Sequence, residues 1–519
     1  MTAESKLRSG AALAKTILNP RERPDRVVKY LRALKPWGST LPGLVAASAA
    51  RYPDELAVID DERRVTFAGL WARSERIAAG LGAQGVGVGT VVGVLARNHA
   101  GFVEAATAVS ATGADLVLMN TGFAGPQLAD VVEHEGVAVL IHDDDFADVV
   151  AGCGAETIID EAALEALASE PGAIAPPEKF GRTVILTSGT TGRPKGASRS
   201  SDPEQIEAVA AMIDKIPLRL RDTQVIAAPL FHAWGLSHLL LGLSRSATSV
   251  LARRFEPSAT LAATSSHDAE VLVVVPVMLS RILDDAVLSA QPTPRLRAIA
   301  ASGSAIGPGL VRRILDHFGP VLYNLYGSTE VAVATIATPA DLQIDPATAG
   351  RVVLGTRIEI LDADGDPVPD GEIGRVFVGS AMPFDGYTNG GDKERIRGLL
   401  SSGDMGRFDG GLLFIEGRDD DMIVSGGENV FPAEVEELLR GHAGIADAAV
   451  IGVDDDEFGQ ALAAFVVLES GAELGVEDVR AHVKEQLARH KVPRTVTFLD
   501  ELPHNATGKL LRRTLPELI

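Results

Sequence analysis

The sequence predicts a multidomain α/β protein with largely parallel sheets. Short apolar runs typical of strands alternate with segments that carry apolar residues at helical spacing. The strand candidates are residues 56–59, 91–95, 116–119, 137–141 and 183–187, and the helix candidates include 67–81 and 102–111. Short strands and turns then predict a small β subdomain at about 352–378, and helices and strands alternate again beyond the acidic residues 419–421. We therefore expect a basic extension over residues 1–40, a large domain over 41–419 and a small, mobile α/β domain over 420–519.

Length and composition favour a globular enzyme. The chain has 519 residues, which is more than one hydrophobic core normally serves, and 46% of them are hydrophobic. Its net charge of -22 opposes binding to the phosphates of nucleic acid. Cys153 is the single cysteine, so a disulfide within the chain is excluded and a reducing compartment is favoured. No apolar run approaches the roughly 20 residues that cross a bilayer, and no signal peptide is evident. We expect a cytoplasmic protein whose oligomeric state the sequence leaves open.

The first 35 residues are basic although the whole chain is acidic. Nine lysines and arginines oppose only Glu4, Glu22 and Asp25, and apolar residues recur at helical spacing from Leu7 to Leu18. An interfacial helix that contacts anionic lipid is one interpretation, and a solvated helical extension is the other.

The strongest local motif is residues 187–196, Thr-Ser-Gly-Thr-Thr-Gly-Arg-Pro-Lys-Gly, directly after a predicted strand. Its glycines let the backbone bend and expose N–H groups, and its hydroxyls and lysine add donors for phosphate oxygens. The residues concerned are Ser188, Gly189, Thr190, Thr191, Gly192 and Lys195. Because the lysine lies between proline and glycine, this is a phosphate cradle but not the P-loop of NTPases. His142 with the three aspartates that follow it is interpreted as a strand end and a solvated acidic turn instead of a metal site.

This motif resembles the signature of the adenylate-forming superfamily, which includes acyl-CoA synthetases, firefly-type luciferases and peptide-synthetase adenylation domains. The resemblance runs from about residue 41 to 513 and is closest to bacterial fatty-acyl-CoA synthetases. Further motifs follow in the family's order: Pro-Leu-Phe-His-Ala-Trp-Gly at 229–235, Tyr-Gly-Ser-Thr-Glu at 326–330, Ser-Gly-Asp-Met-Gly at 402–406, residues 417–430, and Asn-Ala-Thr-Gly-Lys at 505–509.

The resemblance implies ATP and Mg²⁺ as cofactors. Glu330 and Thr190 are expected to ligate Mg²⁺, for which oxygen ligands are suited. Tyr326 is expected to stack on adenine, and Asp404 with Arg418 to hold the ribose. The remaining nucleotide contacts are expected from Gly303, Ser304, Ala305, Gly327, Ser328 and Thr329.

A mobile lysine and a hinge are also implied. Lys509 is expected to neutralise charge where a carboxylate attacks the α-phosphorus, because two anions must meet there. Rotation at Asp420 is expected to withdraw this lysine and bring Gly426 and Gly427 toward coenzyme A (CoA).

The acyl site is expected around His232, Trp234 and Gly235, together with Gly303 and Gly327. His232 is either catalytic or simply a pocket residue. No carboxylate near it is available to pair with a substrate amine, so an acid with an uncharged tail is favoured. Small residues at 300–305 are expected to leave room for the tail, and Trp234 to gate it.

The sequence therefore predicts an AMP-forming ligase that joins a fatty-type acid to CoA. The alternatives are an enzyme that loads a carrier protein, a ligase for an aryl or other acid, a luciferase-like oxygenase and a non-catalytic nucleotide binder. The class of the acid, the acceptor and the pathway are left open.

Overall fold

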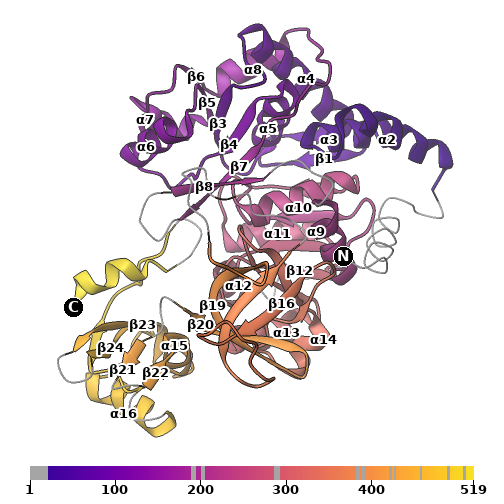
Figure 1. The fold of residues 1–519 in the computed structure, drawn as a ribbon. Helices are drawn as coiled ribbons and strands as arrows, with labels where there is room; N and C mark the ends of the chain where they lie inside the picture. The colour runs from indigo at the N-terminus through magenta and orange to yellow at the C-terminus, as the bar shows by residue number, and fades with distance from the viewer. Residues whose placement is uncertain are drawn as a thin grey trace.

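The computed structural model has the α/β architecture that the sequence predicts, with a large N-terminal part and a small C-terminal part (Figure 1). It describes residues 22–188, 194–199, 205–285, 293–380, 386, 393–419, 423–425, 428–455, 459–487, 491–505 and 510–519. Among the helices of these residues, none is long and apolar enough to span a membrane.

The first large sheet contains six strands in the order β6-β5-β3-β4-β7-β8, of which only β8 is antiparallel to its neighbour. Buried residues dominate the central strands, as is usual for a parallel sheet covered by helices. The strands are β3 (Val91–Leu95), β4 (Asp115–Leu118), β5 (Val139–His142), β6 (Thr157–Ile159), β7 (Thr183–Ser188) and β8 (Pro194–Arg199). The accompanying helices are α4 (Phe67–Ala83), α5 (Ala100–Thr112), α6 (Gly125–Glu135), η1 (Asp144–Phe146), α7 (Ala147–Val150) and α8 (Glu161–Ser169).

The second large sheet contains nine strands in the order β15-β14-β13-β12-β11-β9-β10-β1-β2. Its middle, from β13 to β1, is parallel. Its strands are β1 (Leu56–Ile59), β2 (Arg64–Thr66), β9 (Thr223–Ile226), β10 (Thr248–Val250), β11 (Val271–Val274), β12 (Ala298–Ala301), β13 (Leu322–Ser328), β14 (Ala332–Ala337) and β15 (Arg351–Val352). Its helices are α9 (Gln205–Lys215), α10 (Ala233–Ser244), α11 (Pro257–Ser266), α12 (Pro276–Asp284), α13 (Pro308–Phe318) and α14 (Pro339–Ile344).

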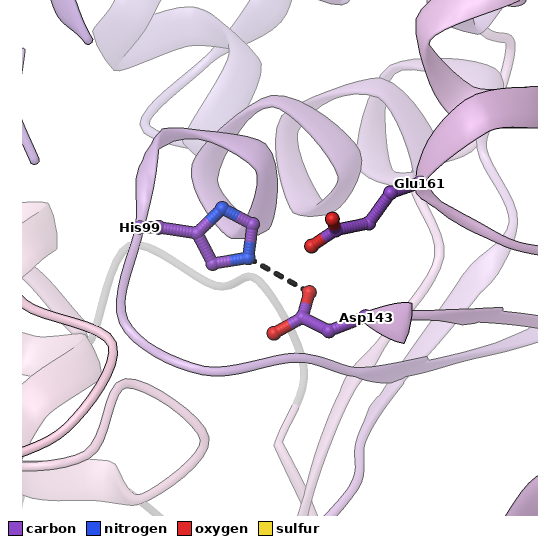
Figure 2. A group of neighbouring side chains, drawn as sticks. All are labelled: His99, Asp143 and Glu161. Carbon is purple, nitrogen blue, oxygen red and sulfur yellow. Dashed lines mark hydrogen bonds and ion pairs between the residues drawn. The ribbon is translucent and has the colours of Figure 1, made fainter. Parts of the chain in front are cut away.

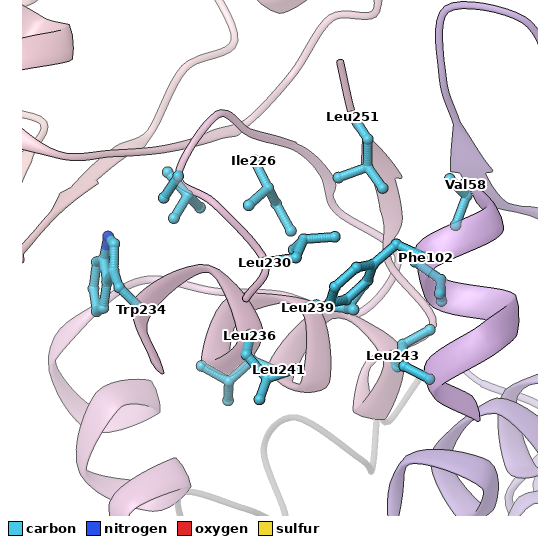
Figure 3. Packing of buried hydrophobic residues seen from close by; sticks show 14 of the residues in the cluster. Val58, Phe102, Ile226, Leu230, Trp234, Leu236, Leu239, Leu241, Leu243 and Leu251 are labelled. Carbon is cyan, nitrogen blue, oxygen red and sulfur yellow. The ribbon is translucent and has the colours of Figure 1, made fainter. Parts of the chain in front are cut away.

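One apolar cluster joins the two large sheets. Figure 3 shows Phe102 of α5, Leu230 after β9 and Leu239 of α10 in this cluster, which also includes Val94 of β3. All four side chains are fully buried, so the cluster removes a large apolar area from water and holds the two sheets together.

The N-terminal helices α2 (Pro24–Trp37) and α3 (Leu41–Arg51) pack onto this large domain. The fully buried Arg51 side chain donates to Glu22, and the Tyr52 hydroxyl donates to the same carboxylate at 2.5 Å. The basic arm is therefore packed from residue 22 onward, while residues 1–21 lie outside the described part. Lipid contact through this arm stays a prediction.

The β subdomain extends further than the sequence indicated, from β16 to Arg418. It contains β16 (Arg357–Leu361), β17 (Gly374–Gly379), β18 (Arg395–Ile396), β19 (Leu399–Asp409) and β20 (Leu412–Arg418). The later strands are only half-buried over much of their length and lack long apolar runs, so periodicity did not reveal them. Gly410 and Gly411, both with positive φ, form the turn between β19 and β20.

The small C-terminal domain has a sheet in the order β22-β21-β24-β23, with β25 paired to β24. Its elements are β21 (Ile423–Ser425), β22 (Glu428–Val430), α15 (Pro432–Arg440), β23 (Ile445–Asp455), β24 (Gly459–Leu468), α16 (Val476–Gln486), β25 (Thr495–Phe498) and η4 (Arg512–Leu518). Two apolar clusters of its own lie on this sheet. The exact domain boundaries stay predictions.

Candidate active site

The predicted phosphate cradle lies at the end of a parallel strand. β7 runs parallel to β4 and ends at Ser188, and the chain returns antiparallel as β8, so that Thr187 is opposite Lys195 and Ser188 is opposite Pro194. The motif is therefore closed at its base by a β-hairpin, which the sequence analysis did not foresee. Gly189, Thr190, Thr191 and Gly192 lie outside the described residues, so their contacts stay predictions.

Tyr326 of β13 in the nine-stranded sheet and Arg418 of β20 in the β subdomain converge on Asp404 of β19. The Tyr326 hydroxyl donates to Oδ2 of Asp404 at 2.5 Å, and Arg418 Nη1 donates to Oδ1 at 3.3 Å. Arg418 is also the ladder partner of Asp404 in the β19–β20 hairpin. Burial, together with the nearby Asp404 carboxylate, raises the pKa of Tyr326 well above its usual value, so the phenol stays a donor. Three residues that the sequence predicts around a nucleotide thus meet in one place.

The backbone around Asp404 is held firmly. Its N–H donates to the Ser402 hydroxyl at 3.1 Å, and that hydroxyl donates to the Val376 carbonyl at 3.1 Å. Gly403 has φ +81°, which a side chain would make costly. Asp404 is therefore presented in one orientation by its own hairpin.

Glu330 is placed by a tight turn after β13. The Ser328 hydroxyl donates to Glu330 Oε2 at 2.7 Å and accepts the N–H groups of Glu330 and Val331. Gly327 begins this turn at a bulge, and a Cβ there would lie 1.9 Å from the Ala332 carbonyl oxygen. A half-buried carboxylate at a strand end fits a Mg²⁺ ligand chemically. The second predicted ligand, Thr190, is not among the described residues.

Gly303, Ser304 and Ala305 are exposed at the end of β12, next to β13 and Tyr326. The Ser302 hydroxyl donates to the Leu325 carbonyl at 3.0 Å, which joins the ends of these two strands. Ala300 and Ala301, however, are fully buried within β12. The expectation that all of residues 300–305 leave room for a substrate tail is wrong for these two, because the strand packs both into the core.

His232 lies at the N-terminal end of α10 as its N-cap residue. Its Nε2 is enclosed and has no hydrogen-bond partner among the described residues. Burial lowers the pKa of His232 to about 4, so its ring is uncharged at neutral pH. An uncharged imidazole acts as a hydrogen-bonding group and not as a cation.

Trp234 follows His232 in the first turn of α10. Its indole Nε1 donates to the Val274 carbonyl at 3.0 Å, and its ring packs edge-on against His238 at 4.5 Å between centroids. Only 9% of Trp234 is exposed. Movement of this indole as a gate would require loss of that hydrogen bond, so the contacts favour a fixed wall.

His238, one turn further along α10, was not singled out from the sequence. It is fully buried, and neither ring nitrogen has a hydrogen-bond partner in the described part of the chain. Burial, assisted by the charge of Arg245, lowers its pKa to about 3. It is a neutral core histidine beneath Trp234.

A second cluster has side chains of the kind that bind metals. Ligand atoms of His99, Asp143 and Glu161 lie within 4.8 Å of one another (Figure 2). Asp143 is only 2% exposed, so the expectation of a solvated acidic turn is wrong at this position. Nη1 of Arg253 lies 2.6 Å from Glu161 Oε1 and 3.4 Å from Asp143 Oδ2. Because a guanidinium already balances both carboxylates, the cluster is best explained as a structural ion-pair network.

Asp419, the residue before the predicted hinge, is hydrogen-bonded to the large domain. The N–H of Asp419 donates to the Gly403 carbonyl at 3.0 Å, and Arg375 Nε donates to the Asp419 carboxylate at 3.1 Å. Asp420, Gly426, Gly427 and Lys509 lie outside the described residues, so the hinge, the CoA contacts and the catalytic lysine stay predictions.

Comparison with known proteins identifies relatives over nearly the whole chain. The family model described as AMP-binding enzyme matches residues 45–388, and that of the AMP-binding enzyme C-terminal domain matches 434–509. A 2-succinylbenzoate–CoA ligase of Bacillus cereus (strain Q1) is 32% identical over 497 residues, which cover 92% of this chain and 99% of that protein. A feruloyl-CoA synthase of Amycolatopsis sp. is 32% identical over 468 residues, which cover 89% of this chain and 95% of that protein.

Solved structures agree with these matches. The o-succinylbenzoate CoA synthetase of Bacillus subtilis, in complex with its acyl-adenylate intermediate, has a TM-score of 0.82 at 30% identity and covers 91% of this chain and 97% of its own. An anthranilate CoA ligase in complex with anthranoyl-AMP has a TM-score of 0.85 at 25% identity and covers 92% and 96%. The acids named for these four relatives are aromatic, so they give no support to the expected fatty acid.

Replacement of Asp404 tests its predicted contact with ribose. Asp404→Asn keeps the size of the side chain but removes the charged acceptor, so we expect the Kd for AMP to rise about 10-fold or more. The Kd for 2′,3′-dideoxy-AMP, which lacks both hydroxyls, should not change. Calorimetric titration of both nucleotides measures this, and equal losses for the two would contradict a ribose contact.

The buried histidines predict a pH dependence of stability. Their folded pKa values lie below the unfolded value of about 6.5, so the unfolded state binds more protons as pH falls. Their contribution is complete above pH 6.5 and is lost as the pH falls toward 4 for His232 and toward 3 for His238, with a slope of up to about 1.4 kcal/mol per pH unit for each histidine. His238→Leu should therefore lose less stability than wild type between pH 7 and 5. Denaturant unfolding followed by far-UV circular dichroism measures the difference, and parallel pH curves would contradict it.

Proposed function

We propose that this chain, which belongs to the family of AMP-binding enzymes, takes an aromatic carboxylic acid as its substrate. The coarser activity is that of an ATP-dependent acid–CoA ligase that works through an acyl-adenylate. The observation that carries the proposal is the full-length similarity to ligases whose named acids are aromatic. The described residues beside His232 agree, since Phe231, Ala233 and Trp234 offer no carboxylate for a substrate amine.

The proposed chemistry requires that charge be neutralised where the acid meets ATP. Mg²⁺, held by Glu330 and Thr190, would screen the phosphates when it is bound. Asp404 accepts the ribose hydroxyls, and Tyr326 contacts adenine while its hydroxyl holds the carboxylate of Asp404. His232, uncharged at neutral pH, offers a hydrogen bond to the acid. Lys509 brings a positive charge to the carboxylate and the α-phosphate, which favours the adenylation transition state.

Thioester formation is proposed to use a second arrangement of the small domain. Because Asp419 is bonded to the large domain through both its N–H and its carboxylate, rotation is expected to begin at the next residue, Asp420. This rotation withdraws Lys509 and brings Gly426 and Gly427 toward CoA.

Other functions find less support. A fatty acid as substrate is not favoured by the relatives reported above. A carrier protein as acceptor is distinguished from CoA by the assay below. A luciferase-like oxygenase or a non-catalytic nucleotide binder would lack CoA-dependent turnover.

Pyrophosphate release with a panel of acids tests the proposed function. We expect CoA-dependent turnover with 2-succinylbenzoate, ferulate or another aryl acid, and less with medium and long fatty acids. Lys509→Ala should lower the adenylation rate about 100-fold or more while thioester formation from a supplied acyl-adenylate continues. Turnover confined to fatty acids would overturn the substrate class, and absence of turnover with every acid would overturn the ligase.

The hinge is tested by Asp420→Pro. Proline fixes φ near −65° and should hinder rotation at this position. We expect thioester formation to slow at least about 10-fold more than adenylation, which single-turnover measurements of each step can resolve. Equal slowing of both steps would show that rotation does not begin at residue 420.

A further inference from the structure

One buried side chain joins the two large sheets at the predicted acyl site. Asn98 follows β3 of the six-stranded sheet and is 6% exposed. Its Nδ2 donates to the Ala228 carbonyl at 2.9 Å and to the Ile226 carbonyl at 3.3 Å, and its Oδ1 accepts the Leu230 N–H at 2.8 Å. All three partners are backbone groups, one at the last residue of β9 in the nine-stranded sheet and two in the segment that follows it.

The segment that Asn98 holds leads directly to His232. The His232 N–H donates to the Pro229 carbonyl at 3.2 Å, so the chain turns tightly between Asn98's partners and the start of α10. Gly235 packs onto the same turn, since a Cβ there would lie 2.3 Å from the Pro229 carbonyl oxygen. A shift of residues 228–230 would therefore move the first turn of α10 with them.

Asparagine is suited to this place because its amide offers donors and an acceptor together. The three bonds need both: two carbonyls require N–H groups, and one N–H requires an oxygen. Aspartate has the same shape but would keep only the bond to Leu230 and would place a carboxylate against two carbonyl oxygens.

Asn98 is itself held in position by the residues that follow it. The Gly101 N–H donates to Nδ1 of His99 at 3.1 Å, which leaves the ring proton on Nε2 to be donated to Asp143 at 2.8 Å. The Ala100 N–H donates to Asp60 at 2.8 Å. The cluster of His99, Asp143 and Glu161 (Figure 2), together with Arg253, thus fixes the loop that carries Asn98.

We infer that Asn98 is a positioning residue for the acid: it sets the place of His232 and of the first turn of α10. This role rests on the proposed function, because it takes His232 as part of the acyl site. Asn98 acts through the backbone that it holds and not by direct contact with the acid.

Kinetics of Asn98→Ala and Asn98→Asp test the inference. We expect kcat/KM for the acid to fall about 100-fold, as for other small misplacements of reacting groups, while KM for ATP changes less than about 2-fold. Thr107→Val is the matched control, because it also removes a buried hydrogen bond but only one within α5, from Thr107 to Val103 at 2.6 Å. Equal effects on acid and ATP, or a neutral Asn98→Asp, would overturn the inference.

A double-mutant cycle with His232→Ala separates positioning from general damage. If Asn98 acts through His232, the loss caused by Asn98→Ala should shrink to about 2-fold or less in the His232→Ala background. The same 100-fold loss in both backgrounds would show that Asn98 acts elsewhere.

A measurement without turnover keeps this inference separate from the proposed function. NMR titration of the His232 ring, assigned with His232→Gln, should give a pKa of about 4 in wild type and in Thr107→Val. In Asn98→Ala the pKa should move toward 6.5 as the enclosure loosens. An unchanged pKa would overturn the inference even if no acid is turned over, whereas turnover failure alone would overturn only the proposed function.

Discussion

Parallel pairing in the two large sheets is the constraint on which the site depends. Parallel strands end at the same edge, so β13, its neighbour β12, and β9, which β11 separates from β12, all end at one edge of the nine-stranded sheet. His232 follows β9, Gly303 follows β12, and Tyr326 lies near the end of β13 itself. The segments that leave β3 and β7 of the six-stranded sheet carry Asn98 and the phosphate motif. The order and direction of the strands alone therefore bring residues that are far apart in the sequence to one edge.

The nucleotide side of the predicted site contains charged side chains, whereas the two histidines on the acyl side are uncharged. Beside the predicted ribose, the Asp404 carboxylate is paired with Arg418 and accepts a hydrogen bond from the phenol of Tyr326. His232 and His238 are neutral because burial disfavours their charged forms. Neither histidine therefore adds a positive charge beside the predicted acyl site at neutral pH.

The sequence predicted the fold class and many strands well because buried parallel strands are short apolar runs. Val91–Leu95 and Leu56–Ile59 match their predictions to the residue. It predicted β19 and β20 poorly, since their half-buried residues show no simple period. It also failed at Asp143, where burial is created by His99 and Arg253, residues distant along the chain.

Sequence motifs identified the site residues. They did not identify the residues that hold the site in place. Tyr326, Asp404 and Arg418 meet as expected, but nothing local marks Asn98, whose partners lie 128 to 132 positions further along the chain. Asparagine is common in turns, so a single asparagine after a strand gives no signal of a special role. Only the packing of one sheet against the other shows its role.

The C-terminal domain has apolar clusters of its own, which bears on how chains of this kind can evolve. Among the described residues, the clusters assigned to the large part include no residue beyond 415, and those of the small part begin at Ile423. A break in the chain between these points would divide none of them. Each part can therefore accumulate substitutions in its own interior without compensation in the other, and recombination between relatives at this junction would exchange a whole C-terminal module while both interiors stay intact.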